Sequence, residues 1–375
     1  MEAALAENGS GTRADPVIVR DGNLGRLAPV MQANFQDDPK GAVAAEIVAW
    51  LYGIDRGGPE QMGILGQAIA FQDQVMELSA QIQDATGSPS LAAAATTVSL
   101  QTDSATGVFD TAPDGSFDGS VTSVIVPAGE STAAFYYKDS GAGTHVLTAT
   151  AAGLEPGTLD AKVFERSFAT PGEVAFYTGT TWWLNKAAAD AQVQICADRL
   201  DAAGIPNQAF TTEAEMDALA TWVGDATDNG ELDVLVLYGD FPPSIYPDST
   251  AMTDDTIAEL FIESTDGDVI MNHADWMFYG QARNGPAGLQ SMMDIPGIVF
   301  GADNTPMVVT AEGAGIAPSL GDFLSDRPMF LEQLAGNWLV EVALAETADG
   351  LQADPVIVRD GDRGRLIPVY QTNEQ

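Results

Sequence analysis

Hydrophobic and polar residues alternate in short runs between residues 91 and 165. Turn-forming Gly, Asp, Pro and Ser separate five such runs, which read TTVSLQTDS, SVTSVIVPAG, STAAFYYKDS, THVLTATAAG and LDAKVFE. Successive side chains of a strand point to opposite faces of the sheet, so a period of two indicates strands with one buried face. The regular spacing of the turns predicts an all-β sandwich over residues 91–165.

The pattern changes after residue 165 to apolar runs separated by helical stretches. The runs EVAFYTG, LDVLVLYGD, DVIMNHAD and GIVFGADN are typical of buried strands. Helices are predicted in residues 183–205, 212–226 and 253–264. The stretches LVEVALAE, DPVIVRDG and RGRLIPVYQ predict a closing β meander. Strands that alternate with helices predict an α/β domain over residues 166–375, with a mostly parallel sheet covered by helices on both faces.

Residues 60–85 follow a break rich in glycine and proline. Their apolar residues recur at helical spacing, as Ile64, Phe71, Leu78 and Ile82 illustrate. This spacing predicts a helical linker over residues 55–90.

The two ends of the chain carry a duplicated sequence. Residues 1–36 match residues 340–375 at a constant offset of 339, with 23 identities in 36 positions and no gap. Residues 37–54, which follow the first copy, have apolar residues at helical spacing. We therefore interpret residues 1–54 as the last two strands and the last helix of an α/β domain, and residues 166–375 as such a domain lacking that helix.

Three arrangements account for the duplication. In the first, the chain is a segment of a tandem array with a repeat of 339 residues. In the second, it is a subunit whose first segment completes the fold of a neighbouring subunit. In the third, it is one compact protein with a duplicated strand pair. The residues predicted to form a junction between units are Val17, Ile18, Val19, Ile47, Trp50 and Leu51.

The strongly negative charge of the chain argues against binding partners that are themselves negatively charged. It has 54 acidic residues, 15 basic residues and a formal net charge of −39. Such a charge repels phosphate backbones and anionic lipid, so we expect no nucleic-acid partner. No run of 18 apolar residues occurs, which argues against membrane insertion. Acid-rich, lysine-poor surfaces suit a saline exterior, and we predict an extracellular or cell-surface setting.

Two segments resemble known families. Residues 98–154 (VSLQTDSATGVFDTAPDGSFDGSVTSVIVPAGESTAAFYYKDSGAGTHVLTATAAGL) resemble a bacterial immunoglobulin-like (Ig-like) repeat of secreted proteins, which implies a spacer or adhesive module. The α/β region resembles the trehalose-utilisation-like (ThuA-like) branch of the class I glutamine-amidotransferase fold. That resemblance rests on VLVLYGDFPPSIYP, GDVIMNHADWMFYG, GLQSMMDIPGIV, PSLGDFLSDRP and ADPVIVRDGDRGRLIPVYQ. It implies a flavodoxin- or amidotransferase-like parallel sheet.

The catalytic chemistry of amidotransferases requires a cysteine at a sharp strand-to-helix turn. Here Asn272 and His273 stand at that turn, and the single cysteine, Cys196, falls on a predicted helix. The absence of that nucleophile argues against glutaminase activity. The catalytic candidates are His273 as acid or base, with Asp240 and Asp275 as partners.

Acidic loops supply the only weak metal candidates, with calcium as the ion. One loop contributes Asp225, Asp228 and Asp233, and another contributes Asp110, Asp114 and Asp118. Neither loop has the spacing of an EF-hand, and a solvated acidic loop is the more common explanation of such clusters. Aromatic residues near the predicted strand ends form a candidate carbohydrate groove: Trp182, Trp183, Tyr238, Tyr246, Trp276 and Tyr279.

Two functional hypotheses follow. The first is a non-enzymatic repeat unit of an extracellular fibre, sheath or surface layer that joins copies of itself head to tail. In it, the N-terminal segment completes the preceding α/β domain. The second is a secreted carbohydrate-binding or carbohydrate-active ThuA-like protein with an Ig-like spacer. Neither hypothesis calls for a cofactor.

Overall fold

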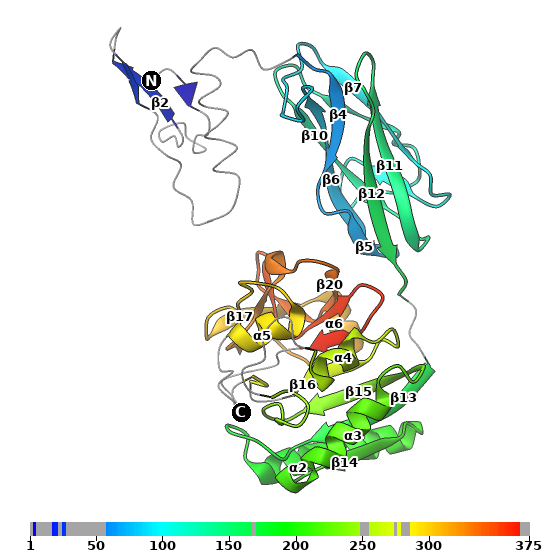
Figure 1. Cartoon of the computed structure of the whole chain (residues 1–375), viewed down its shortest axis with the longest axis vertical. Helices are drawn as coiled ribbons and strands as arrows, with labels where there is room; N and C mark the ends of the chain where they lie inside the picture. The colour runs from blue at the N-terminus through cyan, green and yellow to red at the C-terminus, as the bar shows by residue number, and fades with distance from the viewer. Residues whose placement is uncertain are drawn as a thin grey trace.

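The computed structural model describes most of the chain beyond residue 57 and three strands before it. The described ranges are residues 58–166, 170–247, 255–273, 276–278 and 286–367, with the backbone of β1 (Ala3–Ala4), β2 (Val17–Asp21) and β3 (Gly25–Leu27). Figure 1 shows a β-sandwich formed by β4 to β12 and an α/β domain formed by the elements from β13 onward. The described part is rich in β-structure and contains five sheets.

Two sheets pack face to face in the sandwich. Their strand orders are β4-β6-β10-β8 and β5-β12-β11-β7-β9. The strands are β4 (Gln61–Leu65), β5 (Ile69–Phe71), β6 (Val75–Gln83), β7 (Thr96–Thr102), β8 (Val108–Asp110), β9 (Ser123–Val126), β10 (Thr132–Lys138), β11 (Gly143–Ala151) and β12 (Gly157–Phe164). Leu78 and Phe135 of one sheet share a core with Val98 and Leu147 of the other. The strands predicted from the alternation over residues 91–165 are confirmed.

The helix predicted over residues 60–85 is wrong. This stretch forms β4, β5 and β6, and β6 pairs with β10 along its length. Its buried residues Met76, Leu78 and Ile82 recur at even spacing, whereas Val75 is 39% exposed. A run with apolar residues at most positions satisfies the helical and the strand period together, and only the pairing partner decides between them. Residues 61–83 therefore belong to the sandwich and do not form a helical linker.

The α/β domain is built on a seven-stranded sheet of order β14-β13-β15-β16-β24-β23-β20. Neighbouring strands from β14 to β24 run parallel, and β24, β23 and β20 continue the sheet antiparallel. The strands are β13 (Thr170–Tyr177), β14 (Asn207–Phe210), β15 (Glu231–Leu237), β16 (Val269–Asn272), β20 (Trp338–Ala343), β23 (Val356–Asp360) and β24 (Arg365–Ile367).

Helices cover both faces of this sheet. Val193 of α2 packs against Phe176 and Val236 on one face, and α3 and α4 pack against Tyr177 and Leu237 on the other. Asn185 caps the start of α2 by accepting a hydrogen bond from the Ala188 amide. The helices are α2 (Lys186–Ala203), α3 (Met216–Ala226), α4 (Ile257–Glu263), α5 (Pro286–Met293) and α6 (Ala311–Ile316).

A second, smaller sheet of order β18-β17-β21-β22-β19 completes the domain. Its strands are β17 (Thr305–Val309), β18 (Phe323–Ser325), β19 (Met329–Phe330), β21 (Ala345–Glu346) and β22 (Gln352–Ala353). The strand predicted at residues 297–304 is wrong, because there only Phe300 forms an isolated bridge, to Met329. The helix predicted in residues 37–54 lies outside the described residues. None of the helices that the structure describes is long and apolar enough to cross a membrane.

Candidate functional site

The carboxyl ends of β13, β15 and β16 meet at one edge of the parallel sheet, as parallel strands require. Asp240 follows β15 and His273 follows β16, so the structure brings both sequence-predicted residues to this edge. The third predicted residue, Asp275, lies outside the described residues.

Two loops interlock at this edge. The Asp240 amide donates a hydrogen bond to the Thr180 carbonyl oxygen at 3.2 Å, and the indole Nε1 of Trp182 donates to Asp240 Oδ2 at 2.6 Å. A Cβ atom on Gly239 would lie 1.7 Å from the same Thr180 oxygen, so only glycine permits this approach. Asp240 is 3% exposed, and its carboxylate holds the Trp182 side chain.

His273 lies in an apolar environment behind these loops. Its ring stacks on Tyr238 with centroids 4.1 Å apart, and its Nδ1 atom is buried without a hydrogen-bonding partner among the described residues. Burial lowers the pKa of His273 to about 4, so the imidazole is neutral at physiological pH. The described contacts thus give His273 and Asp240 separate partners, Tyr238 and Trp182, and show no acid–base pair between them.

The cysteine of the chain lies away from the strand-to-helix turn. Cys196 is on α2, half-buried against the sheet, with Sγ 3.7 Å from the Tyr238 hydroxyl. Asn272, which stands at the turn, is fully buried. The site therefore lacks the nucleophile arrangement of an amidotransferase, and its histidine, His273, is neutral at physiological pH.

Sequence reasoning missed a polar cluster at the start of α2. Asp190 accepts hydrogen bonds from Thr178 Oγ1 at 2.7 Å and from Lys186 Nζ, which also lies 3.2 Å from Thr178 Oγ1. Burial opposes ionisation of Asp190, but the bonds from Lys186 and Thr178 outweigh it and lower its pKa. The spacing of Lys186 and Asp190 on one helix face was the signal in the sequence.

The structure divides the aromatic residues that were candidates for a carbohydrate groove. Tyr238, Tyr246 and Trp276 are fully buried core residues. Trp182 and Trp183 are 58% and 67% exposed, in the loop between β13 and α2. Tyr279 lies outside the described residues. Among the candidates that the structure describes, only the adjacent indoles of Trp182 and Trp183 are accessible to a ligand at this edge.

The acidic loops use their carboxylates to stabilise the backbone. Asp233 is 2% exposed and accepts hydrogen bonds from the Glu173 amide at 2.5 Å and from Asn229 Nδ2 at 2.8 Å. Asp225 and Asp228 are exposed. In the described ranges, no three His, Cys, Asp or Glu side chains are grouped so that they could hold a metal ion.

Carboxylates of the second acidic loop also accept hydrogen bonds from backbone amides. Asp110 accepts from the amides of Thr111 and Phe117, and these bonds, chiefly the one from Phe117, lower its pKa. Asp118 accepts from the Ser120 amide at 2.9 Å, and Asp114 is exposed. The structure therefore does not bring Asp110, Asp114 and Asp118 together as metal ligands.

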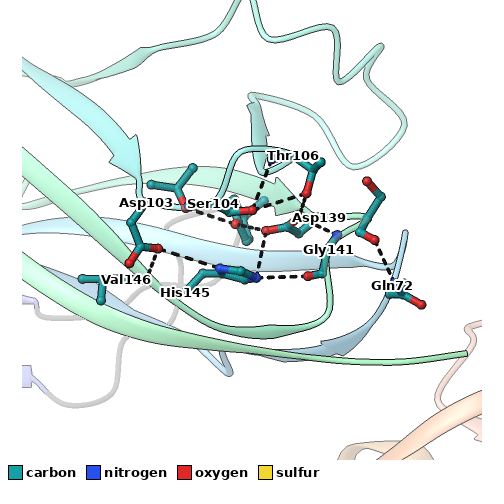
Figure 2. Close-up of polar contacts among 11 residues, drawn as sticks. Gln72, Asp103, Ser104, Thr106, Asp139, Gly141, His145 and Val146 are labelled. Carbon is teal, nitrogen blue, oxygen red and sulfur yellow. Dashed lines mark hydrogen bonds and ion pairs between the residues drawn. The ribbon is translucent and has the colours of Figure 1, made fainter.

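A histidine of the sandwich, His145, lies between two carboxylates (Figure 2). Its Nδ1 and Nε2 atoms are each 3.8 Å from a carboxylate oxygen, of Asp103 and Asp139 respectively. The side chain of His145 is 19% exposed. Asp139 is buried and accepts from Tyr137 and Thr106 at 2.5 and 2.6 Å. Asp103 and Asp139 come from different segments of the sandwich, so no local sequence signal could reveal that His145 lies between them.

The duplicated segments form the same three-stranded sheet twice. In the first copy β1 pairs with β2, and β2 with β3; in the second, β20 pairs with β23, and β23 with β24. The registers agree residue by residue at the offset of 339. Equivalent pairs are Val19–Leu27 with Val358–Leu366, Arg20–Arg26 with Arg359–Arg365, and Ala3–Ile18 with Val342–Ile357.

The two copies differ in what lies beside them. The second copy adds to the parallel sheet because β24 pairs with β16, at Ile270–Leu366 and Met271–Ile367. The first copy is a separate sheet of order β1-β2-β3 in the described residues, so β3, the counterpart of β24, is an edge strand.

A buried ion pair holds the second copy in place. Arg365 Nε and Nη2 donate to the two carboxylate oxygens of Glu341 at 2.5 and 3.1 Å, and Arg365 Nη1 donates to the Gly267 carbonyl oxygen at 2.8 Å. Arg365 is 4% exposed and Glu341 is 8% exposed. The first copy has Glu2 and Arg26 at the equivalent sequence positions.

Comparisons with known proteins add little to this geometry. No family model and no curated protein matches the sequence. A glycosyl hydrolase family 2 member from Bacteroides cellulosilyticus is similar over 28% of this chain and 15% of its own, with 11% identity and a TM-score of 0.23. A cohesin module of a family 33 glycoside hydrolase from Clostridium perfringens is similar over 29% of this chain and 99% of its own, with 10% identity and a TM-score of 0.23.

Domains 4 and 5 of the S-layer protein SbsC are similar over 28% of this chain and 51% of that chain, with 14% identity and a TM-score of 0.20. Each of these three matches covers less than a third of the chain at a low TM-score, so none establishes a family or a function.

Proposed function

We propose that this protein is a non-enzymatic structural unit of an extracellular fibre, sheath or surface layer, in which units join head to tail. The N-terminal three-stranded sheet of one unit would complete the α/β sheet of another. The observation that carries this proposal is the identical register of β1-β2-β3 and β20-β23-β24.

The position that a neighbour's sheet would occupy is defined by the second copy. A strand edge presents unpaired N–H and C=O groups, and another chain satisfies them most readily when its register and side chains already match. In the second copy, the edge of β24 is satisfied by β16. We infer that β3 of a neighbouring unit takes this place beside β16 by displacing β24, and that Arg26 there contacts Gly267 as Arg365 does.

The geometry of such a joint produces an open assembly. The donor segment and the acceptor strand β16 are different surfaces of the same chain, so the contact is heterologous and repeats without closing unless the rotation closes a ring. A formal charge of −39 keeps units soluble before they join and supports a saline, extracellular setting. The Ig-like resemblance of the sandwich supports a spacer between joints.

Sedimentation of the full-length chain over a range of concentrations tests the proposal. We expect reversible, concentration-dependent oligomers for the wild type, and their loss on deletion of residues 1–54. Arg26→Glu should weaken association strongly, because it places a carboxylate where the joint requires a guanidinium. Arg199→Glu on the exposed face of α2 is the control, with the same change in charge and no expected effect.

Two outcomes would overturn the proposal. One is association that survives the deletion unchanged, and the other is a wild-type chain that remains monomeric at every concentration while its circular dichroism shows it to be folded.

A second candidate function is favoured by the exposed indoles of Trp182 and Trp183. A ThuA-like secreted protein with an Ig-like spacer would use them to bind carbohydrate, because sugars stack on aromatic faces and Asp240 fixes one ring. A glycan-binding screen separates this function from the first. Binding that Trp183→Ala or His273→Ala abolishes without loss of stability supports it, and a wild type that binds no glycan argues against it.

A further inference from the structure

The sandwich contacts the duplicated segment of the α/β domain. Gln74 Nε2 donates a hydrogen bond to the Val340 carbonyl oxygen at 3.0 Å, and Arg359 Nη1 donates to the Glu165 carbonyl oxygen at 2.9 Å. The Arg359 guanidinium also lies over the Phe71 ring, 5.4 Å from its centroid. In Figure 1 the β5 end of the sandwich faces the domain that contains β20. Strands β20 and β23 of the α/β sheet therefore also hold the sandwich.

The buried guanidinium of Arg359 is stabilised by these partners. It is 5% exposed, and burial and the nearby Arg365 lower its pKa. A buried guanidinium is costly unless its donors reach acceptors, and Arg359 reaches the carbonyl oxygens of Glu165 and Arg363 as well as an aromatic face. Without the sandwich, an arginine at this position loses the Glu165 carbonyl oxygen as an acceptor and the Phe71 ring as a contact.

Gly361 makes a second close contact with the sandwich. Its φ is +56°, and a Cβ atom on it would lie 2.7 Å from the Phe164 ring. A residue other than glycine would be strained in this backbone conformation and would push the two domains apart.

The first copy keeps two of the residues that contact the sandwich, whereas Met1 stands at the position of Val340. Arg20 stands at the position of Arg359 and in the same strand register, and Gly22 stands at the position of Gly361. By contrast, Leu24 replaces Arg363, whose guanidinium forms longer contacts with Glu263 and Asp360, at 3.9 and 3.7 Å. The duplication therefore preserves the residues at the positions of Arg359 and Gly361 and loses the arginine of a partly exposed ion pair.

We propose that the N-terminal sheet of one unit binds both domains of the unit it joins. Arg20 would donate to the carbonyl oxygen of the partner's Glu165 and lie over the ring of the partner's Phe71. This inference rests on the proposed head-to-tail joint and extends it: the partner is a second copy of this chain, and the docking surface includes the sandwich. Joining would therefore fix the orientation of the two domains as well as lengthen the assembly.

The two copies of the sheet compete for one position. Equivalent substitutions in the two copies should therefore change self-association in opposite directions. In the full-length chain, Arg20→Ala weakens only the neighbour's sheet, so self-association measured by sedimentation should fall about tenfold. Arg359→Ala weakens only the chain's own sheet, so self-association should rise by a similar factor. The double variant Arg20→Ala/Arg359→Ala should return to the wild-type level, because both competitors lose the same contact.

The outcomes separate this inference from the joint itself. If Arg26→Glu abolishes association but Arg20→Ala leaves it unchanged, the strand joint stands and the sandwich contact is wrong. If neither the wild type nor Arg359→Ala associates, the joint fails and the inference fails with it. Thermal unfolding followed by circular dichroism shows whether each variant is folded, and Arg20→Lys, which keeps the charge without the planar fork, should restore only part of the association.

Discussion

Arg365 and Glu341 form a two-pronged ion pair inside the antiparallel part of the seven-stranded sheet, with donor–acceptor distances of 2.5 and 3.1 Å. Both residues are almost fully buried. The pair ties β20 to β24, the two strands that flank β23, and the third bond of Arg365, to the Gly267 carbonyl oxygen, ties them to the loop before β16. The pair thus lies where the duplicated segment meets the rest of the domain.

Removing one partner of this pair should be costly. Glu341→Gln or Arg365→Met leaves the other group buried without its counter-charge, and we expect each to lower the free energy of unfolding by about 3–5 kcal/mol. The double variant should cost less than the sum of the two, because it leaves no unpaired charge. Urea unfolding measures all three, with Arg199→Ala as a surface control. Equal costs for Glu341→Gln and the control would contradict the assignment.

The neutral His273 predicts an acid-sensitive stability. The unfolded chain binds a proton near the ordinary histidine pKa of 6.5, whereas the folded chain binds it only near 4. Between these values the unfolded state holds more protons, so stability should fall as the pH is lowered from 6.5 to 4, by about 3 kcal/mol in total. Urea unfolding at several pH values measures this slope. His273→Phe, which keeps a stacking ring, should remove this component of the slope.

The raised pKa of Asp268 predicts the opposite dependence of stability on pH. Burial, and secondarily Asp233 and Asp266, raise its pKa to about 7 against hydrogen bonds from the Asp233 amide and Ser264. The folded state therefore holds a proton that the unfolded state has lost above 3.8, and stability should fall as the pH rises from about 4 to 7, by about 4 kcal/mol.

Asp268→Asn tests this prediction, since it keeps an acceptor for the Asp233 amide and cannot ionise. The variant should be more stable than the wild type at pH 8 and should lose this part of the pH dependence. A variant less stable than the wild type at pH 8 would show that the ionised carboxylate is the form the fold prefers.

Two glycines predict opposite effects of the same substitution. Gly239→Ala places a methyl group 1.7 Å from the Thr180 carbonyl oxygen, and we expect a loss of about 2–3 kcal/mol and a disturbed contact between Trp182 and Asp240. Gly224→Ala meets no atom within 4 Å and lies in α3, where alanine should add about 0.5–1 kcal/mol. Thermal unfolding, together with the fluorescence of the exposed indoles, distinguishes the two. Similar effects of both substitutions would show that the close approach at Gly239 is not rigid.

Local periodicity predicted much of the fold. The alternation from Thr96 onward predicted the strands of the sandwich, and alternation of strands with helices predicted parallel pairing with cover on both faces. It failed at residues 60–85, where a dense apolar run fits either period and β6 became a strand through its pairing with β10. The candidate site was predicted only as a position, the edge where Asp240 and His273 lie.

The duplication, the charge and the local periods could be determined from the sequence, because each is a property of neighbouring positions or of the composition. The tertiary structure alone decided which charges are paired and which acids serve the backbone. Arg359 reaches the Glu165 carbonyl oxygen across 194 positions, and His145 lies between carboxylates brought together by strand pairing. Such contacts depend on the packing of segments far apart in the chain, and no pattern of adjacent residues encodes them.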